Sequence, residues 1–292
     1  MSDLLQLIFS GIAVGMIYSL LAFGYNITFA TSRTINFAQG EILMLGALTG
    51  LSLTTGMKLP YWAALAGAGV LGGLLGVVVE RIAVRPALRT SSAVSWILAT
   101  VAFGIVARNV AERIWGTDDT KFPGPLGEDP VVFGLIRFVP QEALVIAAAA
   151  LIMLGFEAFR RYSVLGRAVT AAASDKDAAQ LIGINVTRVI TLSFALSSAI
   201  AALAGVLVAP LTLAGATMGT LLGTKAYAVA IIGGLQSGTG VLVGGLILGL
   251  SEQFTARYIS TGYKDAPGFV FLILVLMVRP VGLFGKKAVT KV

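Results

Sequence analysis

The sequence contains no cysteine and no histidine, and only 12% of its 292 residues are charged. Without cysteine there is no disulfide and no thiolate nucleophile, and without histidine no imidazole can bind a metal or relay a proton. Intramembrane proteases and metal-dependent membrane enzymes lose most of their chemistry under these conditions. The phosphate-binding pattern GxxxxGK[ST] is also absent. We therefore expect the chain to be neither an enzyme nor a cofactor-binding protein.

The chain has long apolar runs in place of these groups. Hydrophobic residues make up 57% of it and the mean hydropathy is +0.91, whereas soluble domains are about 45–50% apolar. A membrane helix needs about 20 mainly apolar residues, and continuous runs differ from the alternating strands of a membrane barrel. The sequence predicts an all-α polytopic membrane protein with residues 1–292 in a single transmembrane domain. We count about eight apolar helical segments, some discontinuous, with seven to nine true spans possible: 4–23, 42–53, 60–79, 93–110, 143–159, 189–209, 225–253 and 267–278.

The distribution of basic residues predicts how the chain is oriented in the membrane. The net charge is +7, and arginines gather at Arg81, Arg85 and Arg89 and in the segment 160–188. Lys and Arg are enriched in cytoplasmic loops, so these segments are predicted to lie inside. The same assignment places Lys225 in an outer segment. No basic face with interleaved aromatic residues appears, so no nucleic-acid partner is expected.

The position of the N-terminus is left open by the same reasoning. It lies outside if residues 4–23 and 35–53 both cross the membrane, and inside if one of these segments is re-entrant. The loop over residues 112–140 is rich in Pro, Gly and acidic side chains, which favours the outer side.

The longest polar break in the chain covers residues 162–185, with Arg167, Asp175 and Lys176 among its charged residues. Its middle is rich in Ala, which favours a helix, and Gly183 is a typical helix end. A surface helix between two spans is suited to docking a partner protein on the cytoplasmic side. A solvated loop without a partner is the alternative, and the residues alone leave both open.

A second unusual segment is residues 35–41, INFAQGE, in which polar side chains directly precede an apolar run. Polar and ionisable groups at membrane depth usually face a cavity or the interior of the helix bundle. An Asn cap and an early Glu at the start of a helix are the structural alternative. The segment therefore predicts either a discontinuous helix facing a transport path or a simple helix start.

A Gly-rich stretch over residues 233–249 resembles residues 36–46, because both are short apolar segments entered through Gln and Gly. Paired interrupted helices in the two halves of a chain indicate a transport path built from repeats, although Gly-rich membrane helices often look alike. The residues predicted to line or shape the path are Asn36, Gln39, Gly40, Glu41, Gly233 and Gly234.

Several motifs resemble one family, the LivH-type permease subunits of ABC importers for branched-chain amino acids. The matching pieces run in order through nearly the whole chain, so the resemblance is specific. They are 35–41 (INFAQGE), Glu80-Arg81, Arg85-Pro86, 165–168 (LGRA), 181–185 (LIGIN), 233–235 (GGL) with the Gly-rich run 240–249, and 279–285 (RPVGLFG).

The resemblance implies that the loop over about 160–188 contains a cytoplasmic coupling helix that docks on an ATP-binding subunit. The residues that match the family there are Gly166, Arg167, Ala171, Asp175, Ala178, Ala179, Gly183 and Ile184. The implied partners are a second related permease, two cytoplasmic ATP-binding subunits, an extracytoplasmic substrate-binding protein and the lipid bilayer of a bacterial inner membrane.

The function expected from this resemblance is ATP-driven import of branched-chain or related amino acids by alternating access. An ion-coupled secondary transporter is the first alternative, and it would need an intramembrane acid such as Glu41 or Glu252. A passive channel for a small solute is the second. The carried substrate and the pairing of the permease, with itself or with a different chain, are left open by the sequence.

Overall fold

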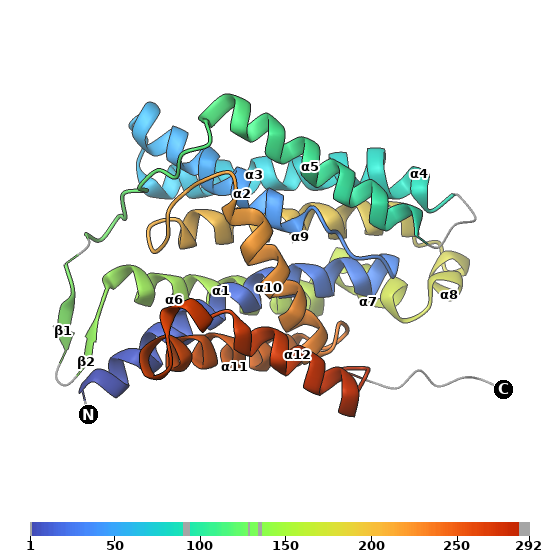
Figure 1. Ribbon diagram of the computed structural model, residues 1–292. Coiled ribbons are helices and arrows are strands. Elements are labelled where there is room, and N and C mark those ends of the chain that lie inside the picture. The colour runs from blue at the N-terminus through green and yellow to red at the C-terminus, as the bar shows by residue number, and fades with distance from the viewer. Residues whose placement is uncertain (1, 90–93, 128, 134–135, 286–292) are drawn as a thin grey trace.

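The protein is an all-α membrane protein in which most helices run side by side between two opposite ends (Figure 1). The structure, a computed structural model, describes residues 2–89, 94–127, 129–133 and 136–285. The helices are α1 (Ser2–Ser32), α2 (Gln39–Leu51), α3 (Tyr61–Val79), α4 (Arg85–Ala87), α5 (Ser95–Trp115), α6 (Pro140–Tyr162), α7 (Val164–Ser174), α8 (Lys176–Leu181), α9 (Val186–Val208), α10 (Met218–Gly233), α11 (Gly238–Tyr258) and α12 (Ala266–Val278).

Short irregular elements complete the chain. Two π-helical turns, η1 (Ser52–Gly56) and η2 (Glu80–Val84), extend α2 and α3, and a 3₁₀ turn, η3 (Thr261–Tyr263), precedes α12. The strands β1 (Val131–Phe133) and β2 (Ile136–Phe138) pair antiparallel, with Val131 opposite Phe138. This hairpin lies near the N-terminus, at what we call the hairpin end, whereas α4, α7 and α8 lie at the opposite end, the α8 end (Figure 1).

Six helical segments in the described part of the chain are long and apolar enough to cross a membrane. They contain α1, α3 with α4, α6, α9, α11 and η3 with α12, while α10 is a shorter apolar helix. The helix α5 runs alongside them, and α2 is a shorter helix (Figure 1). Residues 225–253, which the sequence left as two spans or one broken hairpin, are the two helices α10 and α11 with a turn between them.

The first helix is longer than its apolar run predicts, because α1 continues from residue 23 to Ser32. The added polar residues are accommodated inside the protein. Asn26 donates to the Leu235 carbonyl oxygen over 2.8 Å, and the Thr28 and Thr31 hydroxyls donate to carbonyl oxygens one turn earlier in α1. Buried polar groups cost little when they are hydrogen-bonded, so the helix continues through a polar stretch.

The core is built where helices approach closely through small residues. A Cβ on Gly205 of α9 would overlap the Leu43 carbonyl oxygen of α2, and one on Gly245 of α11 would meet the Gly15 carbonyl oxygen of α1 at 2.6 Å. Small residues at helix interfaces are typical of membrane bundles, because association there depends on close van der Waals packing. One continuous hydrophobic core joins α1, α2, α9, α10 and α11.

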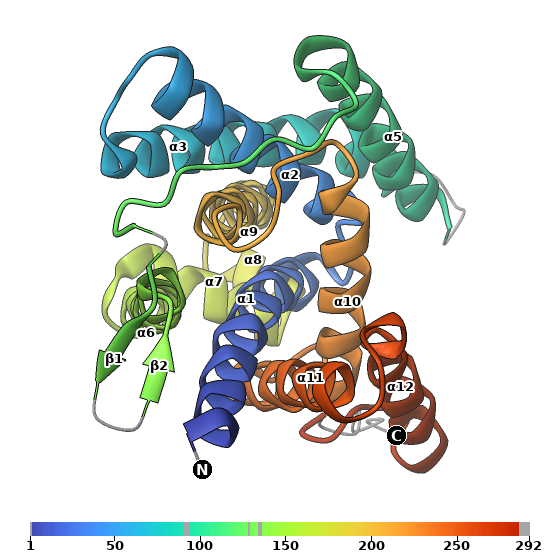
Figure 2. The ribbon, with the colours of Figure 1, turned by 60° about the vertical axis from the view of Figure 1, so that its left-hand side comes forward.

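Two helices begin inside the protein rather than at its ends. After Ser32 the chain turns at Arg33, whose φ is 63°, and residues 34–38 run back into the interior before α2 begins at Gln39. The loop over 209–217 likewise leads inward from the hairpin end to the start of α10, and it pairs with Thr120 through Ala214. Figure 2 shows α10 beside α2, lying between α5 and α12.

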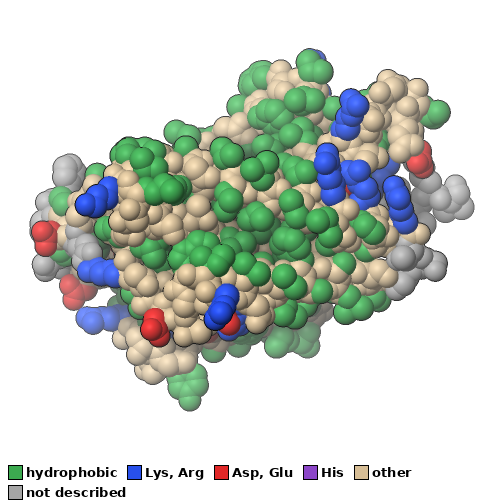
Figure 3. Space-filling view, turned by 90° about the horizontal axis from the view of Figure 1, so that it is seen from above, with side chains coloured by type: hydrophobic (Ala, Val, Ile, Leu, Met, Phe, Trp, Pro, Cys, Tyr) green, Lys and Arg blue, Asp and Glu red, His purple; other side chains and the backbone are tan. Residues whose placement is uncertain are grey.

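The two basic segments predicted to lie inside, which contain α4, α7 and α8, lie at the same end of the molecule (Figure 1). On the face drawn in Figure 3, Lys and Arg side chains lie near both ends, with hydrophobic side chains over the surface between them. The prediction for Lys225 is wrong, however, because this residue is buried in α10 and not in an outer loop. Lys225 can be buried because it pairs with Glu252 and Asp265. These partners are far from Lys225 in the sequence, so the pairing could not be predicted from it.

Candidate functional site

The internal start of α2 brings the four polar or small residues of the predicted path together. Asn36 is fully buried, and its Oδ1 accepts from the Ala38 backbone N–H over 3.1 Å. Gln39 is also fully buried; its Nε2 donates to the Ser197 carbonyl oxygen of α9 over 3.0 Å. The Ser197 hydroxyl in turn donates to the Gly24 carbonyl oxygen of α1 over 2.8 Å. Asn36 and Gln39 therefore fix the start of α2 between α1 and α9.

Glu41 lies in a different environment from these two residues. Its side chain is at the interface of α2 with α10, where the Thr220 hydroxyl donates to Oε1 over 2.7 Å. Its second oxygen, Oε2, is buried and has no hydrogen-bond partner among the described residues. The residue is only 9% exposed. Buried carboxylate oxygens normally have partners, so this unpaired oxygen marks Glu41 as a candidate functional group.

Gly40 permits the close approach of the two internal helix starts. A Cβ at this position would overlap the Gly219 carbonyl oxygen and lie 3.0 Å from the Gly223 Cα, both in α10. The same contact seen from α10 is equally tight, because a Cβ on Gly219 would lie 2.9 Å from Glu41 Oε2. Both helix starts therefore depend on glycine at their crossing.

A polar stripe on α10 and its entry loop was missed in the sequence. Thr217, Thr220 and Thr224 are exposed, although they lie on a helix that is otherwise largely buried. Their spacing of three and four residues places them on one face. Only this spacing could have revealed the stripe, because threonine is common in membrane helices and carries no charge.

We call the place where the starts of α2 and α10 cross, at Gly40, Glu41 and Gly219, the junction. Aromatic rings lie on the side of the junction toward the α8 end. The ring of Phe37 lies 5.3 Å from that of Tyr227 and 6.2 Å from that of Trp96, and Tyr25 lies 6.0 Å from Tyr227. Phe37, Trp96 and Tyr227 are partly exposed. The junction therefore combines one carboxylate and a threonine stripe with an apolar aromatic surface.

Gly233 and Gly234 lie at the opposite end of α10 from its crossing with α2, and their role in the path stays a prediction. They lie at the last turn of α10, where a Cβ on Gly233 would overlap the backbone of Gly240. The Leu283 backbone N–H donates to the Ile232 carbonyl oxygen over 2.8 Å. These glycines thus allow the segment after α12 to pack against the end of α10. The second interrupted helix begins at Met218 instead.

The polar break over residues 162–185 forms two short helices rather than one. Ser163 caps α7, and Asp175 caps α8 by accepting from the backbone N–H groups of Asp177 and Ala178, each over 3.0 Å. Gly183 has a φ of 86°, a conformation that glycine adopts without strain and that ends a helix. Asp175 and Gly183 therefore shape the break itself.

The predicted coupling residues divide into an inner and an outer group. The inner group packs against the rest of the chain: Gly166 and Ala179 are buried, and Ala171 and Ile184 are partly buried. The outer group is exposed and comprises Arg167, Asp175, Ala178 and Gly183. Two apolar side chains that the prediction did not name are strongly exposed, with Leu181 at 90% and Ile182 at 75%.

One hydrogen bond connects the two regions. Lys176 Nζ of α8 donates to the Ser32 carbonyl oxygen, at the end of α1, over 3.1 Å. Ser32 directly precedes the turn that leads to α2. Burial, and to a smaller extent the positive charge of Arg33, lower the pKa of Lys176 below the ordinary lysine value, while Asp177 acts in the opposite direction.

A buried ion cluster lies on the other side of α10. Lys225 Nζ is 2.9 Å from Glu252 Oε1 and 2.6 Å from Asp265 Oδ1, and the Tyr18 hydroxyl donates to Glu252 Oε2 over 2.8 Å. The cluster joins α1, α10 and α11 to the start of α12. In the part of the chain that the structure describes, no group of three or more His, Cys, Asp or Glu residues could hold a metal ion.

Comparisons with known proteins agree with this architecture. Residues 7–278 match a family described as "Branched-chain amino acid transport system / permease component". The chain is 36% identical to the LivH permease protein of the high-affinity branched-chain amino acid transport system of Escherichia coli K12, over 99% of this chain and 97% of that one. It is 33% identical to the BraD permease protein of Pseudomonas aeruginosa, over 99% and 98% of the two chains.

A solved structure, PsaBC from Streptococcus pneumoniae in complex with Fab, shares the fold with a TM-score of 0.51 and 13% sequence identity, covering 97% of this chain and 94% of that one. The full-length matches identify the protein as a transport permease component and not an enzyme. The chain belongs to the family of permease components of branched-chain amino acid transport systems.

Proposed function

We propose that this chain is a single permease domain of an ATP-driven importer that moves branched-chain or related amino acids across a bacterial inner membrane. The observation that carries the proposal is the junction of α2 and α10, where both helices begin inside the protein. Glu41 lies at this junction with one unpaired oxygen, beside Thr220. Discontinuous helices that meet at membrane depth are typical of substrate sites in transporters.

The chemistry of the junction fits an amino acid with an apolar side chain. The Glu41 carboxylate and the hydroxyls of the threonine stripe offer polar partners for the ammonium and carboxylate ends of an amino acid. Phe37, Trp96 and Tyr227 offer an apolar surface for its side chain. In this proposal Asn36, Gln39 and Gly40 shape the path and do not contact the substrate.

The open face of α10 supports pairing with a second permease. Thr217, Thr220 and Thr224 are exposed at membrane depth on a single chain. The Thr220 and Thr224 hydroxyls already donate within the chain, to Glu41 and to the Thr220 carbonyl oxygen. Their oxygens can still accept from water or substrate if the face lines a path between two subunits, which lipid cannot offer. We therefore propose that a second, related permease covers this face and that the path runs between the two chains.

The tip of α8 supports docking of a cytoplasmic ATP-binding subunit. Leu181 and Ile182 are exposed beyond the membrane-spanning helices, where apolar side chains need a protein partner to be buried. The small core of Val169, Ala172 and Ala179 fixes α7 and α8 against the start of α9. A partner that binds the tip can therefore move the two helices together.

The bond from Lys176 to Ser32 supplies a route from this docking site to the path. A displacement of α8 would pull on the end of α1 and on the turn at Arg33, and residues 34–38 would transmit it to Glu41. The energy for this motion comes from ATP bound by the partner subunits. A substrate-binding protein on the outer side would deliver the amino acid.

The first test is native mass spectrometry of this chain after gentle extraction from its own membrane. We expect it to copurify with an ATP-binding subunit and a second permease. Recovery of the chain alone, under conditions that preserve other membrane complexes, would contradict the importer assembly and favour an ion-coupled transporter or a channel.

The second test measures leucine uptake by the reconstituted complex in sealed vesicles. Uptake should require ATP and persist when ion gradients are dissipated, while ATP-independent uptake driven by an ion gradient would contradict the proposal. Ile182→Asp should abolish ATP-dependent uptake and release the ATP-binding subunit. The matched control is Asp177→Asn, which changes an exposed residue of α8, the helix that Ile182 directly follows, and it should retain uptake.

A further inference from the structure

A basic pocket lies between the α8 ends of α3 and α9, away from the junction and from the tip of α8. It has a volume of about 680 Å³. The polar part of its lining consists of Arg81, Arg85, Asn185, Thr187, Arg188 and Thr191, and the apolar part of Val77, Leu192 and Ala195. Among the described residues, no acidic side chain lines it. The lining therefore combines three guanidinium groups with an apolar floor.

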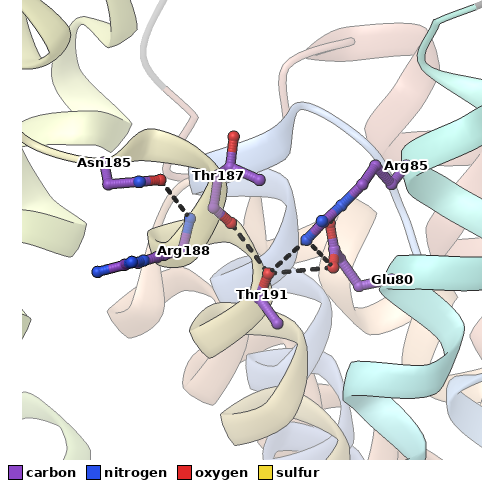
Figure 4. Close-up of polar contacts among 6 residues, drawn as sticks. All are labelled: Glu80, Arg85, Asn185, Thr187, Arg188 and Thr191. Carbon is purple, nitrogen blue, oxygen red and sulfur yellow. Dashed lines mark hydrogen bonds and ion pairs between the residues drawn. The ribbon is translucent and has the colours of Figure 1, made fainter.

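One of the three arginines is already neutralised. Arg85 donates to both carboxylate oxygens of Glu80, from Nε over 2.9 Å and from a terminal nitrogen over 2.7 Å. Thr191 completes this arrangement by donating to Glu80 Oε2 over 3.0 Å (Figure 4). The pair holds α3 against α9 and forms one wall of the pocket.

The π-helical turn η2 makes this pairing possible. It covers Glu80–Val84 and is followed by Pro86, which has no backbone N–H and disturbs the helix hydrogen bonds before it. The wider turn brings residues five apart onto one side, so Arg85 reaches Glu80. Arg81 is thereby left without Glu80 as its partner.

Arg81 and Arg188 carry the charge that remains. Both are exposed, and neither guanidinium has an acidic partner in the described parts of the chain. Asn185 caps α9 and leaves its positive N-terminal end at the pocket. In Figure 4 the side chain of Arg188 points away from the Glu80–Arg85 pair, so it is not neutralised by Glu80.

The surroundings of the pocket indicate what kind of anion it fits. A row of exposed apolar side chains runs along α3 and η2 toward Arg81: Val70, Leu74, Val78 and Ile82. Such a row at helical spacing suits the acyl chains of a lipid. The arginines lie where this row ends, at the α8 end of the molecule (Figure 1).

We propose that the pocket binds the phosphate headgroup of an anionic phospholipid of the cytoplasmic leaflet. Arg81 and Arg188 bind the phosphate, and the lipid chains lie along the apolar row of α3. Basic pockets between membrane helices on the cytoplasmic side bind such headgroups, and arginine forks match phosphate oxygens. The bound lipid would fix the α3–α9 pair at the start of α9, next to α8.

The test measures phosphatidylglycerol retained by the full chain, in its complex where one copurifies, in native mass spectra from nanodiscs of phosphatidylcholine with phosphatidylglycerol. Each arginine near an anionic membrane surface contributes a factor of about five to lipid affinity. Arg81→Gln should therefore weaken retention about fivefold, and Arg81→Gln with Arg188→Gln about twenty-five-fold. The matched control Arg279→Gln removes an exposed charge from the same end and should leave retention unchanged.

A second pair of variants separates binding from folding. Arg81→Lys with Arg188→Lys keeps both charges and should retain most of the lipid, with an unchanged elution profile on size-exclusion chromatography. Unchanged retention in the double Gln variant would overturn the proposal. Arginine-dependent binding of inorganic phosphate to the lipid-free protein, with no retained phosphatidylglycerol, would assign the pocket to free phosphate instead. Loss of a protein subunit without loss of lipid would show that the pocket is a protein interface.

Discussion

Glu41 and Glu252 are carboxylates at comparable burial inside the membrane part of the protein, and their surroundings differ. Glu41 is 9% and Glu252 is 6% exposed. Glu252 lies 2.9 Å from the Lys225 ammonium and accepts from Tyr18. Glu41 accepts only from Thr220, and its second oxygen has no partner among the described residues.

This difference in partners indicates that Glu252 has a structural role, whereas the Glu41 carboxylate is available for function. Lys225 forms ion pairs with both Glu252 and Asp265, so the positive charge of the lysine is balanced. Together with Tyr18 these residues connect four helices. The burial of this cluster is tolerated because its charges are paired.

Glu41 forms no ion pair among the described residues. Arg108 and Glu112 of α5 act on its charge without direct contact, and its carboxylate lies beside the exposed Thr220 of α10. A carboxylate that binds substrate in a transport path needs an oxygen without a protein partner. A carboxylate that holds helices together needs both oxygens to be paired.

The largest effect is expected from removing the lysine of the paired site. Lys225→Met leaves two acidic side chains without their cation, and breaking a buried ion pair in this way costs about 3–5 kcal/mol. The free energy of unfolding should fall by this amount in denaturant titrations of the purified protein. Lys264→Met, an exposed change nearby, is the matched control and should have little effect. Equal stability of the two variants would contradict the structural role of the cluster.

Isosteric replacement of the two carboxylates compares them directly. Glu252→Gln weakens the contacts to Lys225 and Tyr18. Hydrogen bonds to charged groups contribute about 1.5–3 kcal/mol, so the free energy of unfolding should fall by about this amount. Glu41→Gln keeps the bond from Thr220 and removes a charge that lacks a second partner, so stability should stay the same or rise. Leucine uptake should instead fall about tenfold, equivalent to about 1.4 kcal/mol. Normal uptake by Glu41→Gln would leave Glu41 as a helix-start residue.

The close crossing of α2 and α10 beside Glu41 can be tested by substitution of Gly40. Gly40→Ala pushes α2 away from Gly219 and Gly223, and overpacking of this kind costs about 1–3 kcal/mol. Uptake should fall with it, because Thr220 moves away from Glu41. Gly155→Ala on α6 meets no atom within 4 Å and is the control. If both alanine variants transport equally well, the close crossing of α2 and α10 is not required.

The smallest effect is expected at the link between α8 and α1. Lys176→Met removes one hydrogen bond to Ser32, worth about 0.5–1.5 kcal/mol. ATP hydrolysis by the complex should continue while leucine uptake falls, because docking is kept and transmission is lost. Uptake that remains in proportion to ATP hydrolysis would argue against this link.

The same residue predicts a dependence of stability on pH. The folded protein lowers the pKa of Lys176, so the folded state binds fewer protons there than the unfolded state. Stability from this group therefore rises as pH increases through the lowered pKa, up to the unfolded value of about 10.4. In Lys176→Met this alkaline increase should be absent from unfolding curves measured across that range.

Much of the candidate site was predictable because polar residues in an apolar sequence are conspicuous. Asn36, Gln39 and Glu41 were predicted to line or shape the path or to start a helix; the structure buries them at the start of α2, and their place in a path stays a prediction. The break at Asp175 and Gly183 was also visible, since both residue types end or begin helices. The sequence could not distinguish the fixed Gln39 from the open Glu41, because their partners Ser197 and Thr220 are more than 150 residues away.

The sequence by itself determined that the chain is a bundle of apolar membrane helices with polar breaks between them, since this depends on local hydropathy and helix-ending residues. Only the tertiary structure decided that the second internal helix start is Met218 and not Gly233. It also decided that Lys225 is buried, that Glu252 is paired and that Glu41 is not. The physical reason is that a residue's neighbours across helices set whether its charge is compensated, and those neighbours follow from packing and not from position in the chain.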